Sequence, residues 1–102
     1  MRVLSRKKVR EYGEANAQAK EEVAIWFAKM ELGEWHNLNE VKEDILSVDY
    51  IGNDRYVFNV KGNHYRVIVM LFFATQRIYI HDILTHAEYT KLSKKDILTS
   101  KP

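Results

Sequence analysis

Apolar and polar residues alternate along the second half of the chain in a way that predicts three consecutive antiparallel strands. The first alternating segment starts at residue 55 and ends at a Gly-Asn dipeptide at 62–63. The second contains an apolar run at 67–74, and the third begins after a Thr-Gln dipeptide at 75–76. Alternating segments separated by such short polar dipeptides are typical of β-hairpins. We therefore expect two hairpins between residues 55 and 83.

A two-residue turn at 62–63 decides which side chains share a face of this sheet, because side chains alternate between its two faces. One face then carries polar and cationic residues, namely Asn59, Lys61, His64 and Arg66. The other face is expected to be core, with Phe58, Val60, Tyr65 and Val67. If the dipeptide at 75–76 closes the second hairpin in the same way, the polar face also receives Arg77, Tyr79 and His81. A three-residue loop would turn these residues away.

The first half of the chain predicts helical cover for the sheet. Apolar residues recur at helical spacing between Ala19 and Met30, and Gly33 follows as a candidate C-cap. Ser5 is a candidate N-cap for an earlier, shorter helix, and residues 2–4 suit a short edge strand. A weaker helical turn is expected around Val41.

A capping box predicts one more helix after the last strand. Thr85 is followed three residues later by Glu88, the spacing at which a hydroxyl and a carboxylate cap a helix together. His86 and Tyr89 are then expected to share a face in its first turns, beside free backbone N–H groups that favour an anion. The polar tail from residue 91 is expected to fray.

Composition and charge place these elements in one domain with separated charges. A chain of 102 residues that is 46% hydrophobic supports a single domain at 1–102, mostly helical at 1–54, with the sheet and C-terminal helix at 55–92. Acidic residues outnumber basic ones eleven to three at 11–54, whereas basic residues outnumber acidic ones eight to three at 55–102. The sheet is therefore a candidate surface for a polyanion. The alternative is that these charges are only solvated faces.

Cysteine content and hydropathy narrow the class of protein. The chain has no cysteine, which excludes disulfides and thiolate chemistry and suits a reducing cytosol. Its basic N-terminus is not followed by an apolar segment, and its longest apolar run is too short to span a membrane. We expect a cytoplasmic protein that does not interact with membranes.

Several short blocks occur together in the second half of the chain. They are VFN at 57–59, GN at 62–63, YR at 65–66 and THAEY at 85–89. In this order and at this spacing they resemble the HigB toxins, mRNA interferases of type II toxin–antitoxin systems. The regions of Trp26 and Trp35 also look similar, so the resemblance covers roughly residues 20–92. It implies an α+β, RelE-like fold, with N-terminal helices packed on a small, mainly antiparallel sheet of about four strands and a short C-terminal helix.

The resemblance also implies an activity and partners. HigB toxins are endoribonucleases that cleave mRNA, commonly on translating ribosomes, by attack of the RNA's own 2′-hydroxyl on the adjacent phosphate. The expected reaction needs no metal ion and no other cofactor. The expected protein partner is a HigA-like antitoxin with a helix-turn-helix domain, and operator DNA is contacted only through that antitoxin.

Cleavage of this kind needs a base, an acid and cations that stabilise the phosphate. Arg66 suits the phosphate because its planar fork makes paired, charge-assisted hydrogen bonds. His86 can act as base or acid near neutrality, and Tyr89 can act as the acid or stack on a nucleobase. His81 stands where the family usually has Arg and is a third candidate for proton transfer, while Thr90 stands where the family usually has Asp. Candidate RNA contacts are Asn59, Lys61, His64, Arg77 and Lys91.

Each of these assignments has a structural alternative. Arg66 can form a surface salt bridge, Tyr89 can pack its ring on the sheet, and Asn59 can organise the hairpin. The four-residue spacing of Asp82 and His86 is only a weak metal-site signal, so no metal ligand is assigned. At the level of function, the alternative is a non-catalytic RNA- or ribosome-binding module, which the replacement of Arg by His81 favours. A small protein-interaction domain is a third possibility.

Overall fold

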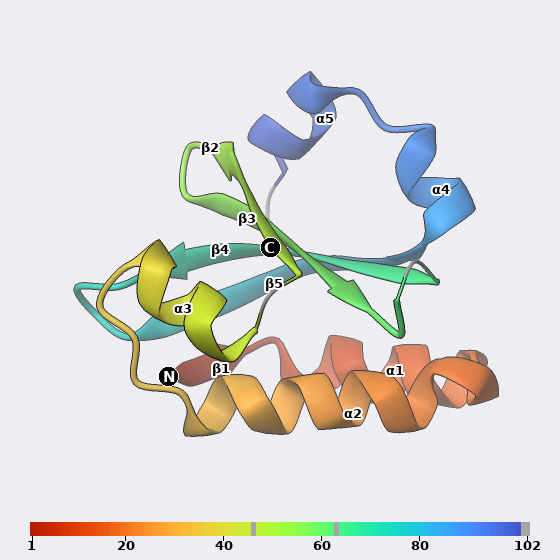
Figure 1. Cartoon of the computed structure of the whole chain (residues 1–102). Coiled ribbons are helices and arrows are strands. Elements are labelled where there is room, and N and C mark those ends of the chain that lie inside the picture. Colours follow the sequence, from red (N-terminus) through yellow and green to blue (C-terminus); the bar gives the residue numbers. More distant parts are fainter. Residues whose placement is uncertain (46, 63, 101–102) are drawn as a thin grey trace.

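Five strands form one sheet in the order β1-β5-β4-β3-β2, and helices lie on both of its sides (Figure 1). The computed structural model describes residues 1–45, 47–62 and 64–100. Within this part of the chain the strands are β1 (Arg2–Leu4), β2 (Val48–Gly52), β3 (Arg55–Val60), β4 (Tyr65–Phe72) and β5 (Arg77–Thr85). Neighbouring strands are antiparallel except β1 and β5, which are parallel. The predicted α+β class is confirmed, with one strand more than expected.

Two long helices cover one face of the sheet. They are α1 (Arg6–Ala15) and α2 (Ala17–Leu32), and the shorter α3 (Leu38–Asp44) leads from them into β2. Most apolar positions predicted for the second helix are buried, with Phe27 half-buried, and the Trp26 ring meets Phe58 of β3 edge to face at 5.5 Å. Burying a side chain of this size contributes about 1.5 to 3 kcal/mol. This layer is the main core, and it joins the helices to the sheet.

A smaller apolar cluster lies on the opposite face, under α4 (His86–Thr90) and α5 (Lys94–Leu98). Val57 and Ile68 from the sheet pack there with Ile97 of α5. The central strand β4 is therefore buried on both faces, which explains why its sequence is a continuous apolar run rather than an alternation.

The register of the first hairpin is confirmed at three pairs. Asn59 pairs with Arg66, and the next pairs are Val60 with Tyr65 and Phe58 with Val67. The backbone N–H of His64 donates to the carbonyl of Lys61 at 3.2 Å, which closes the turn. Asn63, the second residue of the predicted turn, lies outside the described residues.

The second hairpin differs from the prediction in its turn and at one residue, because the two-residue turn expected at 75–76 is part of a longer loop. Its loop covers residues 73–76 and Phe72 pairs with Arg77, so Arg77 and Tyr79 do share the face of Arg66. A β-bulge opposite Ile68 and Val69 inserts one extra residue into β5, and this residue is His81. The bulge removes His81 from the alternation, so the face predicted for it was wrong.

Two further elements correct the sequence prediction. Strand β2 was not predicted, although it pairs with β3 along the edge of the sheet. The tail was expected to fray, but residues 94–98 form α5, in which Ile97 is 5% exposed. Ser93 and Asp96 cap this helix with a second capping box. Residues 101 and 102 lie outside the described chain.

The helix ends are placed as expected, but Ser5 and Gly33 do not make the capping interactions that the sequence predicts. Ser5 precedes α1 without a side-chain capping bond. Gly33 follows α2 with an extended backbone, so a left-handed conformation is not the reason for a glycine at this position. A Cβ atom at Gly33 would lie 2.1 Å from the ring of Trp35, and this close approach excludes any larger residue. No helix in the described ranges is long and apolar enough to cross a membrane.

Candidate active site

Arg66 lies in the middle of the sheet on the face that α4 and α5 occupy. It is the second residue of β4 and pairs with Asn59 on one side and Leu84 on the other. Its side chain is held close to the strand, because the residue is only 7% exposed and one guanidinium nitrogen donates to the carbonyl of Tyr65 at 3.2 Å. A buried guanidinium of this kind is a fixed positive charge.

His86 is brought to Arg66 by the start of α4. The capping box predicted from the sequence is present, since Glu88 N–H donates to the Thr85 hydroxyl and Thr85 N–H donates to the Glu88 carboxylate. The backbone N–H of His86 also donates to the carbonyl of His64 at 2.9 Å, which ties α4 to the tip of the first hairpin. The cap and the hairpin together fix the position of the imidazole.

The guanidinium of Arg66 contacts both candidate side chains of α4. One of its nitrogens lies 3.1 Å from Nδ1 of His86, and its central carbon lies 5.7 Å from the centroid of the Tyr89 ring. His86 and Tyr89 therefore share a face of the helix, as their spacing predicts. The structure brings a cation, an imidazole and a phenol together at one point of the sheet.

The contact between Arg66 and His86 indicates the tautomer of the neutral imidazole. A guanidinium can only donate, so Nδ1 must accept this hydrogen bond through its lone pair. In the neutral ring the proton then lies on Nε2. Nδ1 is thereby occupied as long as Arg66 points at it, and becomes available when Arg66 turns to another acceptor.

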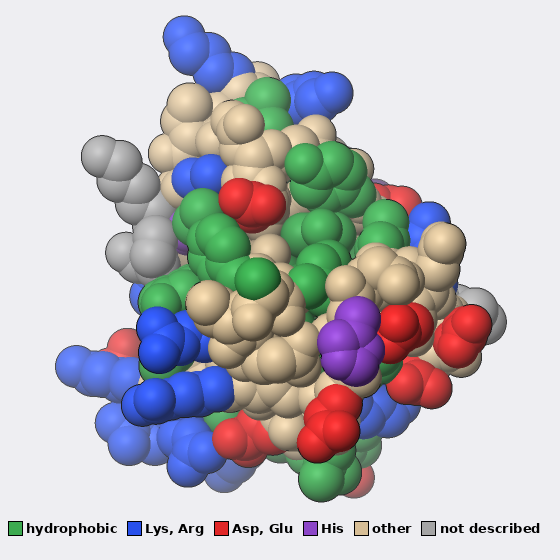
Figure 2. Space-filling model, turned by 90° about the vertical axis from the view of Figure 1, so that its left-hand side faces the viewer, with side chains coloured by type: hydrophobic (Ala, Val, Ile, Leu, Met, Phe, Trp, Pro, Cys, Tyr) green, Lys and Arg blue, Asp and Glu red, His purple; other side chains and the backbone are tan. Residues whose placement is uncertain are grey.

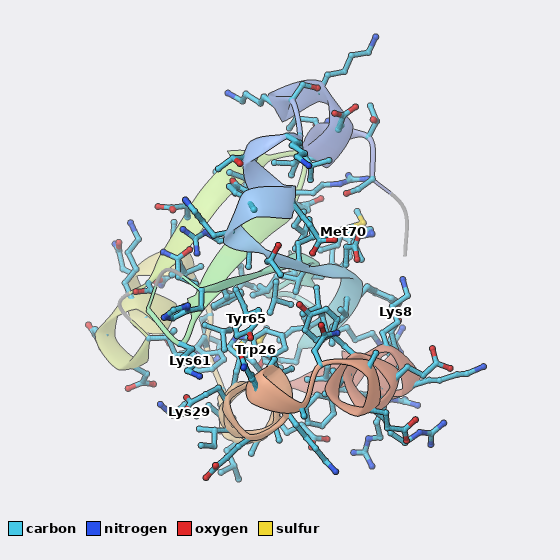
Figure 3. All side chains as sticks on the ribbon, turned by 90° about the vertical axis from the view of Figure 1, so that its right-hand side faces the viewer. Lys8, Trp26, Lys29, Lys61, Tyr65 and Met70 are labelled. Atoms are coloured by element: carbon cyan, nitrogen blue, oxygen red, sulfur yellow. The ribbon has the colours of Figure 1, made fainter. Side chains whose placement is uncertain are left out.

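His81 lies apart from this group, on the side of β5 that faces α1. It is 7% exposed and lines a hollow of about 340 Å³ with Lys8, Glu11 and Tyr12 of α1. The ammonium of Lys8, which rises from α1 toward the sheet in Figure 3, donates to the carbonyl of His81 at 2.9 Å and to that of Ile80 at 3.2 Å. Lys8 thus satisfies carbonyls at the bulge, a role that the sequence alone gave no reason to expect.

Three of the five candidate RNA contacts surround the Arg66 cluster. Asn59 is the strand partner of Arg66, and His64 supplies the carbonyl that binds the start of α4. Lys91 is exposed at the C-cap of α4, two residues beyond Tyr89. These residues therefore lie on the strand, the hairpin and the helix that surround Arg66.

The other two candidates lie farther away. Lys61 is exposed at the hairpin tip and lines a hollow beside α2 with Trp26 and Lys29, and Asn59 also lines this hollow. Figure 3 shows Lys29 below Lys61. Arg77 pairs with Phe72, six residues along β4 from Arg66, so about 20 Å separates the two arginines. Arg77 shares the sheet face of Arg66 but not its site.

Tyr12 joins α1 to the region of the site and was not a candidate from the sequence. Its ring meets that of Tyr65 edge to face at 6.2 Å. Burial raises the pKa of the Tyr12 phenol above its usual value, and the neighbouring Glu88, Tyr65 and Asp82 raise it further. Tyr12 therefore keeps its proton near neutral pH and acts as a neutral support.

Charged side chains are unevenly distributed on the surface, but the main basic group lies at the level of α1 and α2 and not over the sheet, where the sequence predicted it. Figure 2 shows lysine and arginine side chains gathered on one lower side of the molecule and acidic side chains on the other, with apolar side chains between and above them. Among residues 1–45, 47–62 and 64–100, no group of three His, Asp or Glu residues is placed to hold a metal ion.

Most of this chain is similar in sequence to known proteins. The profile of the HigB_toxin family, described as the RelE-like toxic component of a toxin-antitoxin system, matches residues 19–92. A relative from Escherichia coli strain K12, the mRNA interferase toxin HigB, is 33% identical over 92 residues that make up 87% of this chain and 88% of the relative. The mRNA interferase HigB of Shigella flexneri has the same identity and coverage. The mRNA interferase HigB of Escherichia coli O6:H1 is 43% identical over 42 residues, 41% of each chain.

Proposed function

The chain belongs to the HigB toxin family, and on this premise we propose that it is the toxin of a type II toxin–antitoxin system and an endoribonuclease that cleaves mRNA. The observation that carries this proposal is the contact of Arg66 with both His86 and Tyr89. Phosphodiester cleavage needs a cation and two proton-transfer groups at one phosphate, and this cluster offers all three.

In the proposed reaction the 2′-oxygen of the RNA attacks the adjacent phosphorus. The bond from that oxygen to phosphorus forms while the bond from phosphorus to the 5′-oxygen breaks, which leaves a 2′,3′-cyclic phosphate and a 5′-hydroxyl. The 2′-hydroxyl proton goes to a base, and the 5′-oxygen receives a proton from an acid. The chain's own residues supply each of these groups, so the proposed reaction is independent of metal ions.

Arg66 and His86 act in sequence in this proposal. The scissile phosphate is a stronger acceptor than an imidazole, so the guanidinium turns to its oxygens when RNA binds. This movement releases Nδ1 of His86, whose lone pair takes the 2′-hydroxyl proton. Substrate binding therefore prepares the base, and the free enzyme keeps the base occupied.

Tyr89 is the proposed acid for the 5′-oxygen, because its phenol is the second proton-transfer group in contact with Arg66. Asn59, His64 and Lys91 are proposed to hold the RNA on either side, with Lys61 farther along the hairpin. Backbone contacts of this kind position the strand without reading its sequence.

The proposed cellular context follows from the family. The substrate is mRNA on translating ribosomes in the cytoplasm. A HigA-like antitoxin with a helix-turn-helix domain neutralises the toxin, and the pair contacts operator DNA only through the antitoxin. An adjacent reading frame that encodes such an antitoxin, and co-purification of its product with this chain, test this part of the proposal.

The decisive experiment is primer extension on a reporter mRNA in a cell-free translation system with and without the protein. Cuts inside the reading frame that vanish when ribosomes are omitted support a ribosome-dependent interferase. Unchanged cutting by protein that was treated with EDTA and freed of the chelator before its addition supports a reaction without a tightly bound metal ion. If folded, antitoxin-free protein makes no cuts but binds RNA or ribosomes with an affinity that falls linearly with log salt, the protein is a binding module instead.

A further inference from the structure

A small hollow lies between α2 and the tip of the first hairpin, and two lysines line it. Lys29 belongs to α2 and Lys61 to the turn that follows β3, and Figure 3 shows Lys29 below Lys61. The volume of the hollow is about 120 Å³, and its other lining residues include Glu22, Trp26 and Asn59. Within residues 1–45, 47–62 and 64–100, neither lysine makes an ion pair or a side-chain hydrogen bond.

We infer that this hollow is a phosphate-binding site, in which Lys29 and Lys61 hold one phosphate group between them. The site is separate from the one at Arg66, where the scissile phosphate is proposed to bind. The inference rests on the proposed RNA cleavage for the source of this phosphate, which is the RNA strand itself. A free nucleotide carries the same group, so a mononucleotide is a second ligand of the same chemistry.

The charges that line the hollow favour a phosphate as its occupant. Two ammonium groups that share one small space repel each other, and the half-buried carboxylate of Glu22 offsets only one of the two positive charges. A phosphate presents several acceptor oxygens, so each lysine can donate to a different one. Such an anion replaces the repulsion with two charge-assisted hydrogen bonds.

The basic residues of α1 do not offer such a site, although they are more numerous. Each of them already has a partner within the described chain. Arg6 pairs with Glu31, Lys7 with Glu11 and Arg10 with Glu14, while Lys8 donates to carbonyls of β5. Lys29 and Lys61 differ from these residues because they line one hollow and have no such partner among the described residues.

The backbone of Lys61 agrees with a binding role. Its φ of 55° lies in the left-handed region, which residues with a Cβ atom rarely adopt and which glycine and asparagine adopt more easily. A lysine at this position makes the turn less stable and yet provides the second cation of the hollow. Residues in such backbone conformations cluster at ligand-binding and catalytic sites.

Asn59 links the hollow to the Arg66 cluster. It lines the hollow and is also the strand partner of Arg66, so the Cα atoms of this pair are about 4.5 to 5.5 Å apart. Lys61 follows two residues later, at most about 7 Å along the chain. An RNA strand whose scissile phosphate is bound by Arg66 can therefore pass over the hairpin tip and place a neighbouring phosphate between the two lysines.

The indole N–H signals of the two tryptophans in an NMR spectrum test this site directly. Trp26 lines the hollow, whereas the indole N–H of Trp35 donates to the carboxylate of Asp44 at 2.7 Å in a neighbouring hollow. The probes are a 2′-O-methyl oligoribonucleotide, which cannot undergo attack by the 2′-oxygen, and a nucleoside monophosphate. We expect both probes to move the Trp26 signal more than that of Trp35, and the oligonucleotide to do so at a concentration at least about tenfold lower.

Three lysine variants complete the test. Lys61→Asn removes the ammonium and suits the left-handed backbone, so it should be at least as stable as the parent while it loses about tenfold in oligonucleotide affinity. Lys29→Ala, at an exposed position of α2, should lose a similar factor. In both variants the slope of log affinity against log salt should fall by about one. Lys42→Ala, at an exposed position of α3 outside the hollow, is the control and should change neither quantity.

The possible results distinguish this site from the proposed cleavage. Unchanged affinity and salt slope in folded Lys29→Ala and Lys61→Asn, or a Trp26 signal that neither probe moves, overturn the phosphate site while the cleavage stands. A shift with the monophosphate alone assigns the site to a free nucleotide instead of RNA. Loss of antitoxin binding in the two variants, with oligonucleotide binding unchanged, assigns the hollow to a protein partner. If the parent makes no cuts on translated mRNA but both probes move the Trp26 signal, the proposed function fails and the phosphate site stands.

Discussion

Arg66 donates a hydrogen bond to Nδ1 of His86 at 3.1 Å, and this bond links the central strand to the first residue of α4. Each residue is placed by separate means: Arg66 by strand pairing, His86 by the capping box and the hairpin tip. The proposed site therefore depends on the docking of a five-residue helix on the sheet.

Replacing Arg66 with Ala should reduce the cleavage rate by at least about 100-fold, because the phosphate loses its fixed cation. The side chain is also buried, so the free energy of unfolding should fall by about 1 to 3 kcal/mol. Arg66→Lys should recover only part of the activity, since Lys keeps the charge without the planar fork. Primer extension and urea unfolding measure the two effects.

Arg77→Ala is the matched control for this variant. Arg77 shares the sheet face of Arg66 but lies about 20 Å away along the strands. It should lower activity by no more than a few-fold. Equal loss in the two arginine variants would mean that the face binds RNA as a whole and has no single phosphate site.

Two substitutions at Tyr89 distinguish proton donation from ring contacts. Tyr89→Phe keeps the ring beside Arg66 but removes the hydroxyl, and it should slow cleavage by about 100-fold. Tyr89→Ala should slow cleavage further and also weaken RNA binding. Both rates come from single-turnover assays with excess protein. Parental activity of Tyr89→Phe would limit Tyr89 to a stacking role.

The sequence predicted the elements whose patterns are local and strong. The helical spacing in α2, the hairpin around residues 62–63 and the capping box at Thr85 each placed an element correctly. They also brought Arg66, His86 and Tyr89 into the same candidate site. Pairing and capping are local rules, so a single sequence is enough to apply them.

Other features depend on tertiary contacts that the sequence does not show. Strand β2 is short and lies at the edge, where mainly Val48 is buried, so it has little apolar signal. The bulge at His81 has no local sequence signature. Its carbonyl accepts a hydrogen bond from Lys8 of α1, a residue far away in the chain. The cap of α5 was visible as Ser93 and Asp96, but the lysines around it suggested a solvated tail.

The two capping boxes allow a matched test of whether helix capping holds the candidate site together. Thr85→Ala and Ser93→Ala each remove one capping hydroxyl and should each cost about 1 kcal/mol of helix stability. Only Thr85→Ala should reduce cleavage, by about tenfold, because α4 carries His86 and Tyr89. Cleavage rates and urea unfolding of both variants are compared. A similar loss of activity in Ser93→Ala would show that α5 also holds the reacting groups.

The capping box of α5 predicts a pH dependence. Hydrogen bonds from the backbone and side chain of Ser93 lower the pKa of Asp96. Its folded pKa is then below the unfolded one of about 3.9, so its contribution is complete above that value and is lost as pH falls through the lowered pKa. Asp96→Asn should therefore melt below the parent at about pH 6, and the difference should disappear in acid. Thermal melts between about pH 6 and acid measure the difference in melting temperature, with Asp49→Asn as an exposed control. A difference that persists in acid contradicts a stabilising role of the ionised Asp96.

His81 is the remaining proton-transfer candidate, and its position predicts a smaller catalytic effect than that of Arg66. The residue lies in a bulge against α1 and is 7% exposed, so His81→Ala should lower the free energy of unfolding by about 1 to 3 kcal/mol. We expect the cleavage rate at a temperature where the variant is folded to fall by less than about tenfold, against at least about 100-fold for Arg66→Ala. His81→Arg tests the cation usual in the family: its guanidinium has Glu11 and Asp82 within the same hollow, which should hold it away from the RNA and leave the rate near that of the parent. A loss in His81→Ala as large as in Arg66→Ala, or a strong gain in His81→Arg, would instead make this position part of the reacting group.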